Sequence, residues 1–446
     1  MRQNLEKFPA RMWQSLRKKM RWLKPGMGVK RWLLVILLGT TLVGVGLALF
    51  LLDLYRNAPD NALLPVVSAV ALQSFERPLR ILIFGGTGIL VLGFGIWGLN
   101  HSLLQPFTAS GRTLLDTVTA YRKRERGPRV VALGGGTGLS TLLRGVKAYT
   151  SNLTAIVTVA DDGGSSGELR KSTGILPPGD IRNCLAALSN DEALLSQIFQ
   201  YRFATSAGLN GHTLGNLFIT ALAEITGSFE EAVAESGRVL AVQGRVMPAT
   251  LHDVKLVADV RLRGQAKDIQ VKGESQISQA SGQIKRVWLD PASPLAFPPT
   301  LQAILSADLI VVGPGSLYTS LLPNLLVPDL VEALRVSRAL KFFVCNVATQ
   351  RGETDGYTCG DHIRAIEKVT GRVFDLLICN KRTDIKLPEG TGWVTAEPDL
   401  EDKYAVYFAD VVDESMPWRH DSKKLAQVIT DLYYERTGPL ANREEG

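Results

Sequence analysis

The sequence contains few cysteines, and none of them is grouped. Cys184, Cys345, Cys359 and Cys379 form no Cys-x-x-Cys pair and no clustered Cys/His set. This pattern argues against a disulfide framework and a structural zinc site, and it is typical of reduced thiols in a cytosolic compartment. Cys345 and Cys379 lie inside apolar runs, so we expect them to be small buried residues of the core.

Several familiar catalytic motifs are also absent. The chain has no Gly-x-Ser-x-Gly elbow, no His-Glu-x-x-His pair and no glycine-rich loop that ends in Gly-Lys-Ser/Thr. These absences argue against an α/β-hydrolase, a zinc protease of that type and a P-loop nucleotidase. No internal repeat with a period of about 20–50 residues is present, which argues against a solenoid.

Residues 130–446, the longest part of the chain, carry no excess of positive charge. The net charge of +7 comes from residues 1–31, with ten Lys/Arg and one acid, and from residues 112–129, with six Lys/Arg and two acids. Residues 130–446 carry −6. A nucleic-acid-binding domain needs a basic face of its own. We therefore expect no nucleic-acid partner.

Two long runs, residues 32–52 and 81–101, contain no charged residue. At about 1.5 Å per residue, each is long enough as a helix to cross a hydrocarbon core of about 30 Å. Lys/Arg clusters precede the first run and follow the second, so the positive-inside rule places both termini in the cytoplasm. We predict a basic cytoplasmic leader over 1–31, a two-helix anchor in the inner (plasma) membrane over 32–107, and a juxtamembrane connector over 108–128.

From Arg129 onward, short apolar runs alternate with helical patterns, as in βαβ units on a parallel sheet. We predict a doubly wound, Rossmann-like α/β domain over residues 129–446, with an inserted β-rich subdomain over 243–290. The expected strands are Val130–Leu133, Ala155–Ala160, Leu309–Val312, Phe342–Cys345 and Leu376–Cys379. The expected helices include 139–149, 181–188, 193–203, 214–226, 229–240 and 330–340.

The first strand runs into a glycine-rich loop. Glycine lets backbone N–H groups approach an anion, and the N-terminus of the following helix favours negative charge. The match to the dinucleotide fingerprint is incomplete, because Leu139 occupies the third glycine position. A phosphate site is our interpretation, and a tight structural turn is the alternative. A similar stretch, 81–88, lies in an uncharged run and is interpreted as membrane helix. The candidate ligand-binding residues of the loop are Gly134, Gly135, Gly136, Thr137 and Gly138.

The second strand runs into an acidic, glycine-bearing loop. Asp161 lies near the position of the ribose-binding acid of a dinucleotide fold. Asp161 and Asp162 together are alternatively candidate Mg²⁺ ligands beside a diphosphate. A plain turn with solvated acids is the third interpretation. The candidate residues are Asp161, Asp162, Gly163, Ser165 and Ser166.

More polar residues follow later strands or begin helices. In doubly wound sheets the ligand crevice lies outside the carboxyl ends of the strands, so several such loops together predict one site. Asp180 is a candidate N-cap of a helix, and His212 could equally be a structural histidine. The remaining candidate site residues are Asp180, Arg182, Asn183, His212, Asn216, Gly313, Gly315, Ser316, Tyr318, Asn346 and Asp355.

In this order the motifs resemble those of the bacterial gluconeogenesis factor family, which is related to 2-phospho-L-lactate transferase. The resemblance extends from Arg129 to the C-terminal helix, and residues 1–128 lie outside it. Arg351 stands where the family pattern has proline. The matching segments are 134–138, 161–167, 178–183, 212–216, 313–320 and 352–357.

The resemblance implies a Rossmann-like core that binds nucleotide-linked ligands, above all UDP-sugars, and a role in cell shape during growth on gluconeogenic carbon sources. Gly134–Gly138 and Gly313–Ser316 would cradle the diphosphate, and Tyr318 would stack on the base or sugar. The related alternative is a Mg²⁺-dependent transferase that moves a phospholactyl group from a nucleotide diphosphate. A third hypothesis, an NAD(P)-dependent oxidoreductase, rests on the incomplete glycine fingerprint and Asp161. The sequence leaves catalysis and a homo-oligomer open.

Overall fold

The computed structural model describes residues 76–104, 124–190, 192–204, 208–262, 264, 267–280 and 282–438, together with the single residues 37, 40, 41, 44 and 48. The chain divides into two units, Met1–Ala120 and Tyr121–Gly446. The predicted leader 1–31 and most of the predicted first span 32–52 lie outside the described residues.

The first unit contains helix α4 (Arg77–Leu104), which includes the predicted second span 81–101. Residues 81–88 are therefore helical and do not form a strand with a phosphate loop. Over the described part of the chain, no helix combines the length and apolar character that crossing a membrane requires. The prediction of two transmembrane helices is thus not supported.

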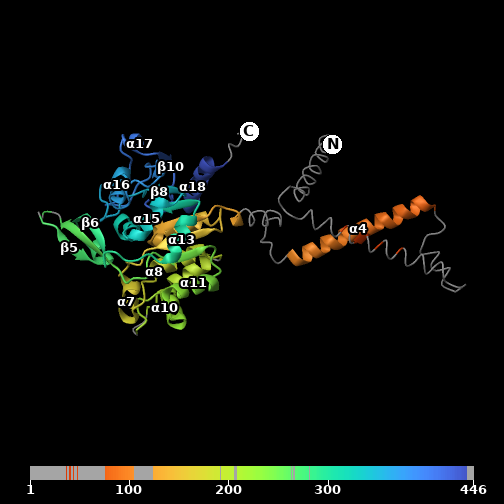
Figure 1. The fold of residues 1–446 in the computed structure, drawn as a ribbon, viewed down its shortest axis with the longest axis horizontal. Helices are drawn as coiled ribbons and strands as arrows, with labels where there is room; N and C mark the ends of the chain where they lie inside the picture. The colour runs from red at the N-terminus through yellow and green to blue at the C-terminus, as the bar shows by residue number, and fades with distance from the viewer. Residues whose placement is uncertain are drawn as a thin grey trace. The chain divides into compact units, whose positions relative to one another are not determined.

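The second unit is built on a sheet of seven parallel strands (Figure 1). The strand order β3-β2-β1-β7-β8-β9-β10 is that of a doubly wound Rossmann-like sheet, which confirms the predicted α/β class. The strands are β3 (Arg245–Pro248), β2 (Leu153–Val157), β1 (Val130–Gly134), β7 (Leu309–Val312), β8 (Leu340–Val344), β9 (Leu376–Asn380) and β10 (Val406–Ala409).

The central strands are buried at every position because helices cover the sheet, and their apolar side chains form the main core. Two of the covering helices, α6 and α18, approach so closely that a Cβ at Gly145 would overlap the carbonyl oxygen of Ser422. The helices are α6 (Gly136–Val146), α7 (Gly164–Thr173), α8 (Gly179–Leu188), α9 (Glu192–Gln200), α10 (Leu214–Thr226), α11 (Phe229–Val239), α13 (Pro298–Ser306), the π-turn η3 (Leu317–Leu321), α14 (Leu322–Leu325), α15 (Pro328–Val336), α16 (Cys359–Thr370), α17 (Leu400–Lys403) and α18 (Ser422–Thr437).

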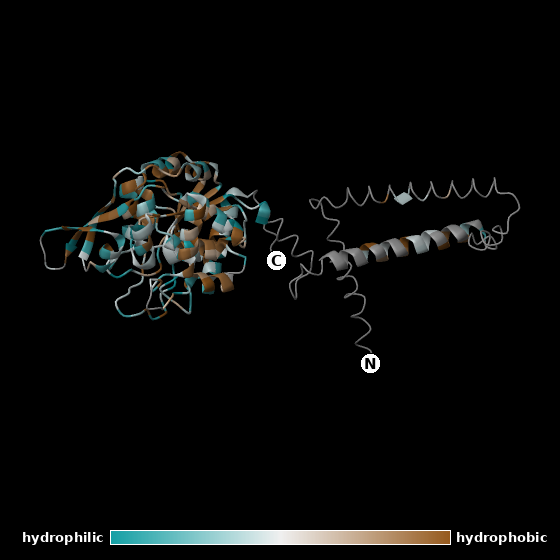
Figure 2. Ribbon diagram, turned by 90° about the horizontal axis from the view of Figure 1, so that it is seen from below, coloured by the Kyte–Doolittle hydropathy of each residue, from teal (hydrophilic) through white to brown (hydrophobic). Residues whose placement is uncertain are grey.

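The predicted β-rich insertion exists but is shorter than residues 243–290. Its antiparallel sheet has the order β5-β4-β6 and projects from one side of the second unit (Figure 1). Its strands alternate between polar and apolar residues, so both teal (hydrophilic) and brown (hydrophobic) residues appear along them in Figure 2. Strand β3, within the predicted insertion, instead pairs with β2 in the main sheet. The elements of the insertion are β4 (Lys255–Leu262), β5 (Ile269–Lys272), α12 (Glu274–Gln279) and β6 (Gly282–Asp290).

The order of the strands determines where a ligand can bind. After β1 the chain winds outward through β2 and β3, and it later returns to the other side of β1 with β7. The loops after β1 and β7 therefore diverge to opposite sides at this switch point, and they leave a crevice between them.

Candidate functional site

The loop after β1 contacts the loop after β7. Helix α6 begins at Gly136, whose φ of 60° lies in the left-handed region that glycine tolerates. A Cβ at Gly138 would overlap the carbonyl oxygen of Pro314. These two predicted loops therefore meet, and only glycine fits at position 138.

A crevice of about 420 Å³ opens at this contact. The N-terminus of α6 forms one side and the loop after β8 forms another, so backbone N–H groups and a helix dipole border the space. Asn346 fixes the neighbouring loop, since its Nδ2 donates to the carbonyl of Gly315 at 2.9 Å. The lining residues are Thr137, Gly138, Thr141, Pro314, Gly315, Ser316, Asn346, Val347, Ala348, Thr349, Gln350, Arg351, Thr391, Trp418, Arg419 and His420.

Three lining residues that the sequence did not single out as ligand contacts give the crevice its chemistry. Arg351 and Arg419 bring two guanidinium groups, and neither has an ion-pair partner among the described residues. Trp418 is 43% exposed and offers an aromatic face. Arginine and tryptophan together can bind a phosphate group and a planar ring.

The predicted residues of the second loop and of helices α8 and α10 form a polar network beside the crevice. Ser165 lies at its centre and interacts with His212 Nδ1 at 3.1 Å and with Asn216 Nδ2 at 3.0 Å. Asn216 Nδ2 also lies 3.4 Å from Ser166 Oγ. His212 is thus a member of the network, and its other ring nitrogen lies 3.5 Å from a carboxylate oxygen of Glu168.

Arg182 ties this network together. Its Nη1 donates to Thr213 at 2.6 Å and to Asn216 at 3.1 Å, and its other nitrogens donate to Asn183. Burial lowers the pKa of Arg182, and the positive charge of Arg202 lowers it further. With these donors engaged, Arg182 organises the network and offers little to a ligand.

The network contains two carboxyl groups with raised pKa values: Asp180, which lies against the glycine-rich loop, and Asp161. Asp180 lies in the first turn of α8 and does not cap it, because the N-cap is Pro178; the predicted N-cap role is wrong. Burial first, and the charge of Asp161 second, raise the pKa of Asp180 to about 7. Burial also raises the pKa of Asp161, although hydrogen bonds from Gly163 and Ser166 oppose the shift.

The adjacent acids Asp161 and Asp162 accept hydrogen bonds from different segments of the chain. Asp161 accepts a hydrogen bond from the N–H of Gly163 at 2.8 Å, within its own loop. Asp162 accepts one from the N–H of Ser275 at 2.9 Å, in the first turn of α12. Asp162 thus joins the loop to the insertion.

Glu274 of the insertion completes an acidic cluster that the sequence did not indicate. One of its carboxylate oxygens is buried without a hydrogen-bond partner. Burial, followed by the charges of Asp161 and Asp180, raises its pKa well above the usual value. Arg170 and Arg182 lower the pKa values of Asp161 and Asp180 respectively, but burial outweighs these positive charges.

Tyr318 is not placed to stack on a ligand in the crevice. The residue is 7% exposed, and its hydroxyl lies 2.8 Å from that of Tyr357. Burial raises its pKa, as does the hydrogen bond to Tyr357. Trp418 is the exposed aromatic residue of the crevice instead.

The polar loop after β8 is held by Glu353. Its carboxylate accepts from Thr319 Oγ1 at 2.9 Å and from Gln350 Nε2 at 3.0 Å. Asp355 accepts from the N–H of Gly352 at 3.1 Å and lines a second cavity beside the insertion, outside the crevice. Leu139, at the third glycine position of the fingerprint, is fully buried.

A comparison with protein families matches residues 130–430 to the model described as 2-phospho-L-lactate transferase CofD. A relative from Nostoc sp., named a gluconeogenesis factor with a provisional qualifier, is 44% identical over 93% of this chain and 92% of its own length. The gluconeogenesis factor of Bacillus subtilis is 45% identical over 69% of this chain and 99% of its own.

The same domain occurs in a solved structure. A crystal structure of a protein member of the upf0052 family from Bacillus halodurans matches with a TM-score of 0.63 and 43% identity. It covers 68% of this chain and 99% of the solved chain. The shorter relatives therefore consist almost entirely of a domain like the one that holds the crevice.

Proposed function

The chain belongs to the gluconeogenesis factor family and carries its 2-phospho-L-lactate transferase CofD-type domain, and we propose that it binds a nucleotide diphosphate-linked ligand, with UDP-sugars as the leading class. The observation that carries this proposal is the crevice at the switch point between β1 and β7. Its position is where doubly wound sheets bind nucleotides.

The lining of the crevice suits each part of such a ligand. The diphosphate would bind at the N-terminus of α6 and the Gly315–Ser316 loop, with Arg351 and Arg419 neutralising its charge. Trp418 lines the crevice and would stack on the uracil ring in place of the buried Tyr318. Arg351 replaces the proline of the family pattern, so it adds a positive charge to the crevice of this chain.

A protein that binds such a ligand without converting it can act as a regulator. We propose that the ligand-bound form signals carbon status to cell-shape control during growth on gluconeogenic carbon sources, and that the domain acts in the cytoplasm. Cells that lack the protein should lose normal shape on such a carbon source, and a chain defective in the crevice should fail to restore it.

Calorimetric titration of the purified chain with UDP-N-acetylglucosamine tests the binding directly. We expect saturable binding that is weakened at least about tenfold in Trp418→Ala, since base–aromatic stacking contributes about 1–3 kcal/mol. Arg238→Ala, on the exposed side of α11 and paired with Glu235, is the matched control and should bind like the natural chain. Absence of binding to every UDP-sugar tried would reject the proposal.

The acidic cluster favours a second candidate, a Mg²⁺-dependent transferase. Asp161, Asp180 and Glu274 carry oxygen atoms of the kind Mg²⁺ prefers, and one oxygen of Glu274 is unpartnered. The three carboxylates do not all lie within 4.8 Å of one another, so they would have to converge on the cation. Mg²⁺ would neutralise the diphosphate leaving group, while the side chains hold the cation beside the glycine-rich loop. Of the predicted pair Asp161 and Asp162, Asp162 is the less suitable ligand, because its carboxylate already accepts a hydrogen bond from the N–H of Ser275.

The variant Glu274→Gln distinguishes the regulator from the transferase. A transferase should lose turnover and Mg²⁺-dependent nucleotide binding in this variant, whereas a regulator should bind the UDP-sugar equally well with or without Mg²⁺. Asp253→Asn, which alters an exposed carboxylate paired with Arg170, serves as the control for a general loss of charge.

A further inference from the structure

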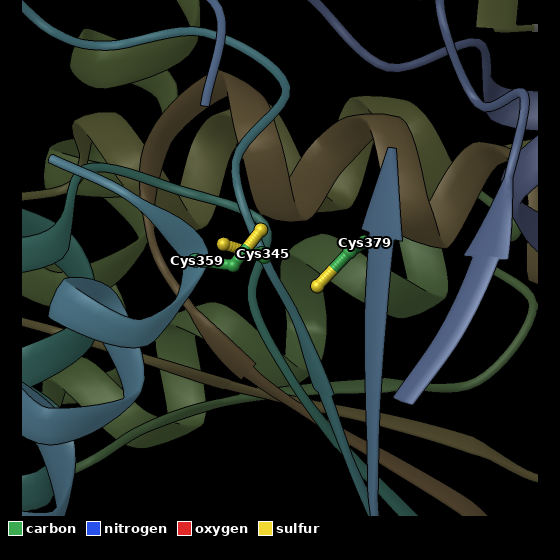
Figure 3. Close-up of side chains that lie close together, drawn as sticks. All are labelled: Cys345, Cys359 and Cys379. Atoms are coloured by element: carbon green, nitrogen blue, oxygen red, sulfur yellow. The ribbon is translucent and has the colours of Figure 1, made fainter. Parts of the chain in front are cut away.

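Three of the four cysteines meet at one point in the second unit (Figure 3). Cys345 follows β8, Cys379 lies in β9 and Cys359 is the first residue of α16. Their three sulfur atoms all lie within 4.8 Å of one another. The cysteines are scattered in the sequence, but strands and a helix far apart in the chain bring three of them together in the fold.

The triad of Cys345, Cys359 and Cys379 is fully enclosed. Each residue is at most 1% exposed, and all three are free thiols. The position of Cys359 in the first turn of α16 favours its thiolate, since the N-terminus of a helix stabilises negative charge. Three soft donors in an enclosed space are the ligand set of thiophilic metals.

A second observation comes from His362, one helical turn after Cys359. The residue is 1% exposed, and its Nε2 atom is buried without a hydrogen-bond partner. Its Nδ1 lies 2.8 Å from the carbonyl oxygen of Thr358, which fixes Nδ1 as the protonated nitrogen and leaves Nε2 as a free acceptor. This is the arrangement that metal-ligating histidines show, with the second ring nitrogen bonded to a backbone carbonyl.

We propose that Cys345, Cys359 and Cys379 bind a thiophilic metal ion, Zn²⁺ or Cu⁺. His362 lies outside the group of ligand atoms within 4.8 Å of one another, so it becomes a fourth donor only if its ring moves toward the sulfur atoms. Tetrahedral zinc with Zn–S bonds of about 2.3 Å places its sulfur atoms about 3.8 Å apart. The observed upper limit of 4.8 Å requires a contraction of at most about 1 Å, within reach of side-chain rotation. Binding releases the thiol protons to solvent and involves no change of oxidation state.

The position of the triad gives the metal a structural role beside the crevice. Cys345 immediately precedes Asn346 and Val347, which line the crevice, and its carbonyl oxygen lies 3.1 Å from Nε2 of His420, another lining residue. A metal ion would therefore hold the ends of β8 and β9 to the start of α16. This assignment does not depend on the identity of the crevice ligand.

Native mass spectrometry of the reduced full chain, titrated with Zn²⁺ and separately with Cu⁺, tests the proposal. We expect one metal ion per chain, and Cys345→Ser or Cys379→Ser should weaken its binding more than about 100-fold. Cys184→Ser is the matched control, since Cys184 is equally buried in α8 but lies outside the triad. Equal metal binding by the triad variants and the control would overturn the proposal.

A Co²⁺ titration of the natural chain makes the test independent of variant folding. Three thiolate ligands should give intense sulfur-to-cobalt charge-transfer bands that Zn²⁺ abolishes, and Zn²⁺ should protect three thiols from alkylation. His362→Gln should shift the cobalt spectrum if the imidazole is a ligand, and an unshifted spectrum would limit the site to the three thiolates. Absence of thiolate bands, or a disulfide within the triad in place of a metal, would overturn the proposal.

Discussion

The carboxyl group of Asp180 packs against the backbone of Gly135 and Gly136, so an acidic group lies on one side of the glycine-rich loop. A Cβ at Gly135 would lie 2.5 Å from the same carboxyl group. No carboxylate lines the crevice on the side of Thr137 and Gly138, so a phosphate group meets no like charge among its lining residues.

Asp180 should make the stability of the domain fall as pH rises. The pKa of Asp180 is about 7 in the folded chain and 3.8 in the unfolded one, so between these values only the folded chain holds the proton. Its contribution to stability is complete below the unfolded value and is lost as pH rises through about 7. Between pH 4 and pH 8 the natural chain should therefore lose on the order of 4 kcal/mol of unfolding free energy through this group, and Asp180→Asn should not show this loss.

Urea unfolding of the ligand-free chain across this pH range measures the effect of Asp180→Asn. Asp421→Asn is a suitable control, because Asp421 caps α18 and asparagine can cap a helix equally well. If the natural chain and Asp180→Asn show the same slope of stability against pH, the assigned titration of Asp180 is incorrect.

Arg419→Ala and Arg351→Ala should each weaken binding of a UDP-sugar by about 10- to 100-fold. Each removes a guanidinium that lines the crevice and has no ion-pair partner among the residues described. The natural chain should also bind more weakly at high salt, and the variants should show a smaller salt dependence. Titrations at two ionic strengths, with Arg238→Ala as control, measure both effects; unchanged affinity in both variants would place the anion elsewhere.

Much of the fold followed from local patterns in the sequence. Strands β1, β7 and β9 are continuous apolar runs that end in glycine or asparagine, and their positions were predicted to within a residue. Strands β3 and β10 were not predicted, because edge strands bury less surface and carry a weaker apolar signal. The sequence pattern therefore does not separate β3 from the insertion that follows it.

The site was predictable only where a loop carries its own signal. The glycine-rich loops after β1 and β7 were found because close backbone approach requires glycine, and they do meet. Arg419, Trp418 and Glu274 come from segments without a motif, and their roles depend on tertiary packing. The burial of Tyr318 and the meeting of the three cysteines likewise depend on contacts between distant segments.

Gly138→Ala should close part of the crevice. The new methyl group would overlap the carbonyl oxygen of Pro314, so one of the two loops must move. We expect a loss of about 1–3 kcal/mol in stability, which is the usual cost of adding a methyl group to a tightly packed site. Binding of UDP-sugars should weaken at least about tenfold. Gly208→Ala, where a Cβ meets no atom within 4 Å, is the control for the lost flexibility of glycine. Equal binding by the two variants would show that this contact does not shape the site.

Glu353 should stabilise the loop that forms one wall of the crevice. Its carboxylate is 4% exposed and receives hydrogen bonds from Thr319, Gln350 and the N–H of Tyr318. Glu353→Ala leaves three donors unpaired, two of them buried, and should cost about 3 kcal/mol, whereas Glu353→Gln keeps one oxygen acceptor and should cost less. Denaturant unfolding measures both variants, and proteolysis within residues 349–357 reports on the loop. Equal stability of Glu353→Ala and the natural chain would mean that packing alone holds this wall of the crevice.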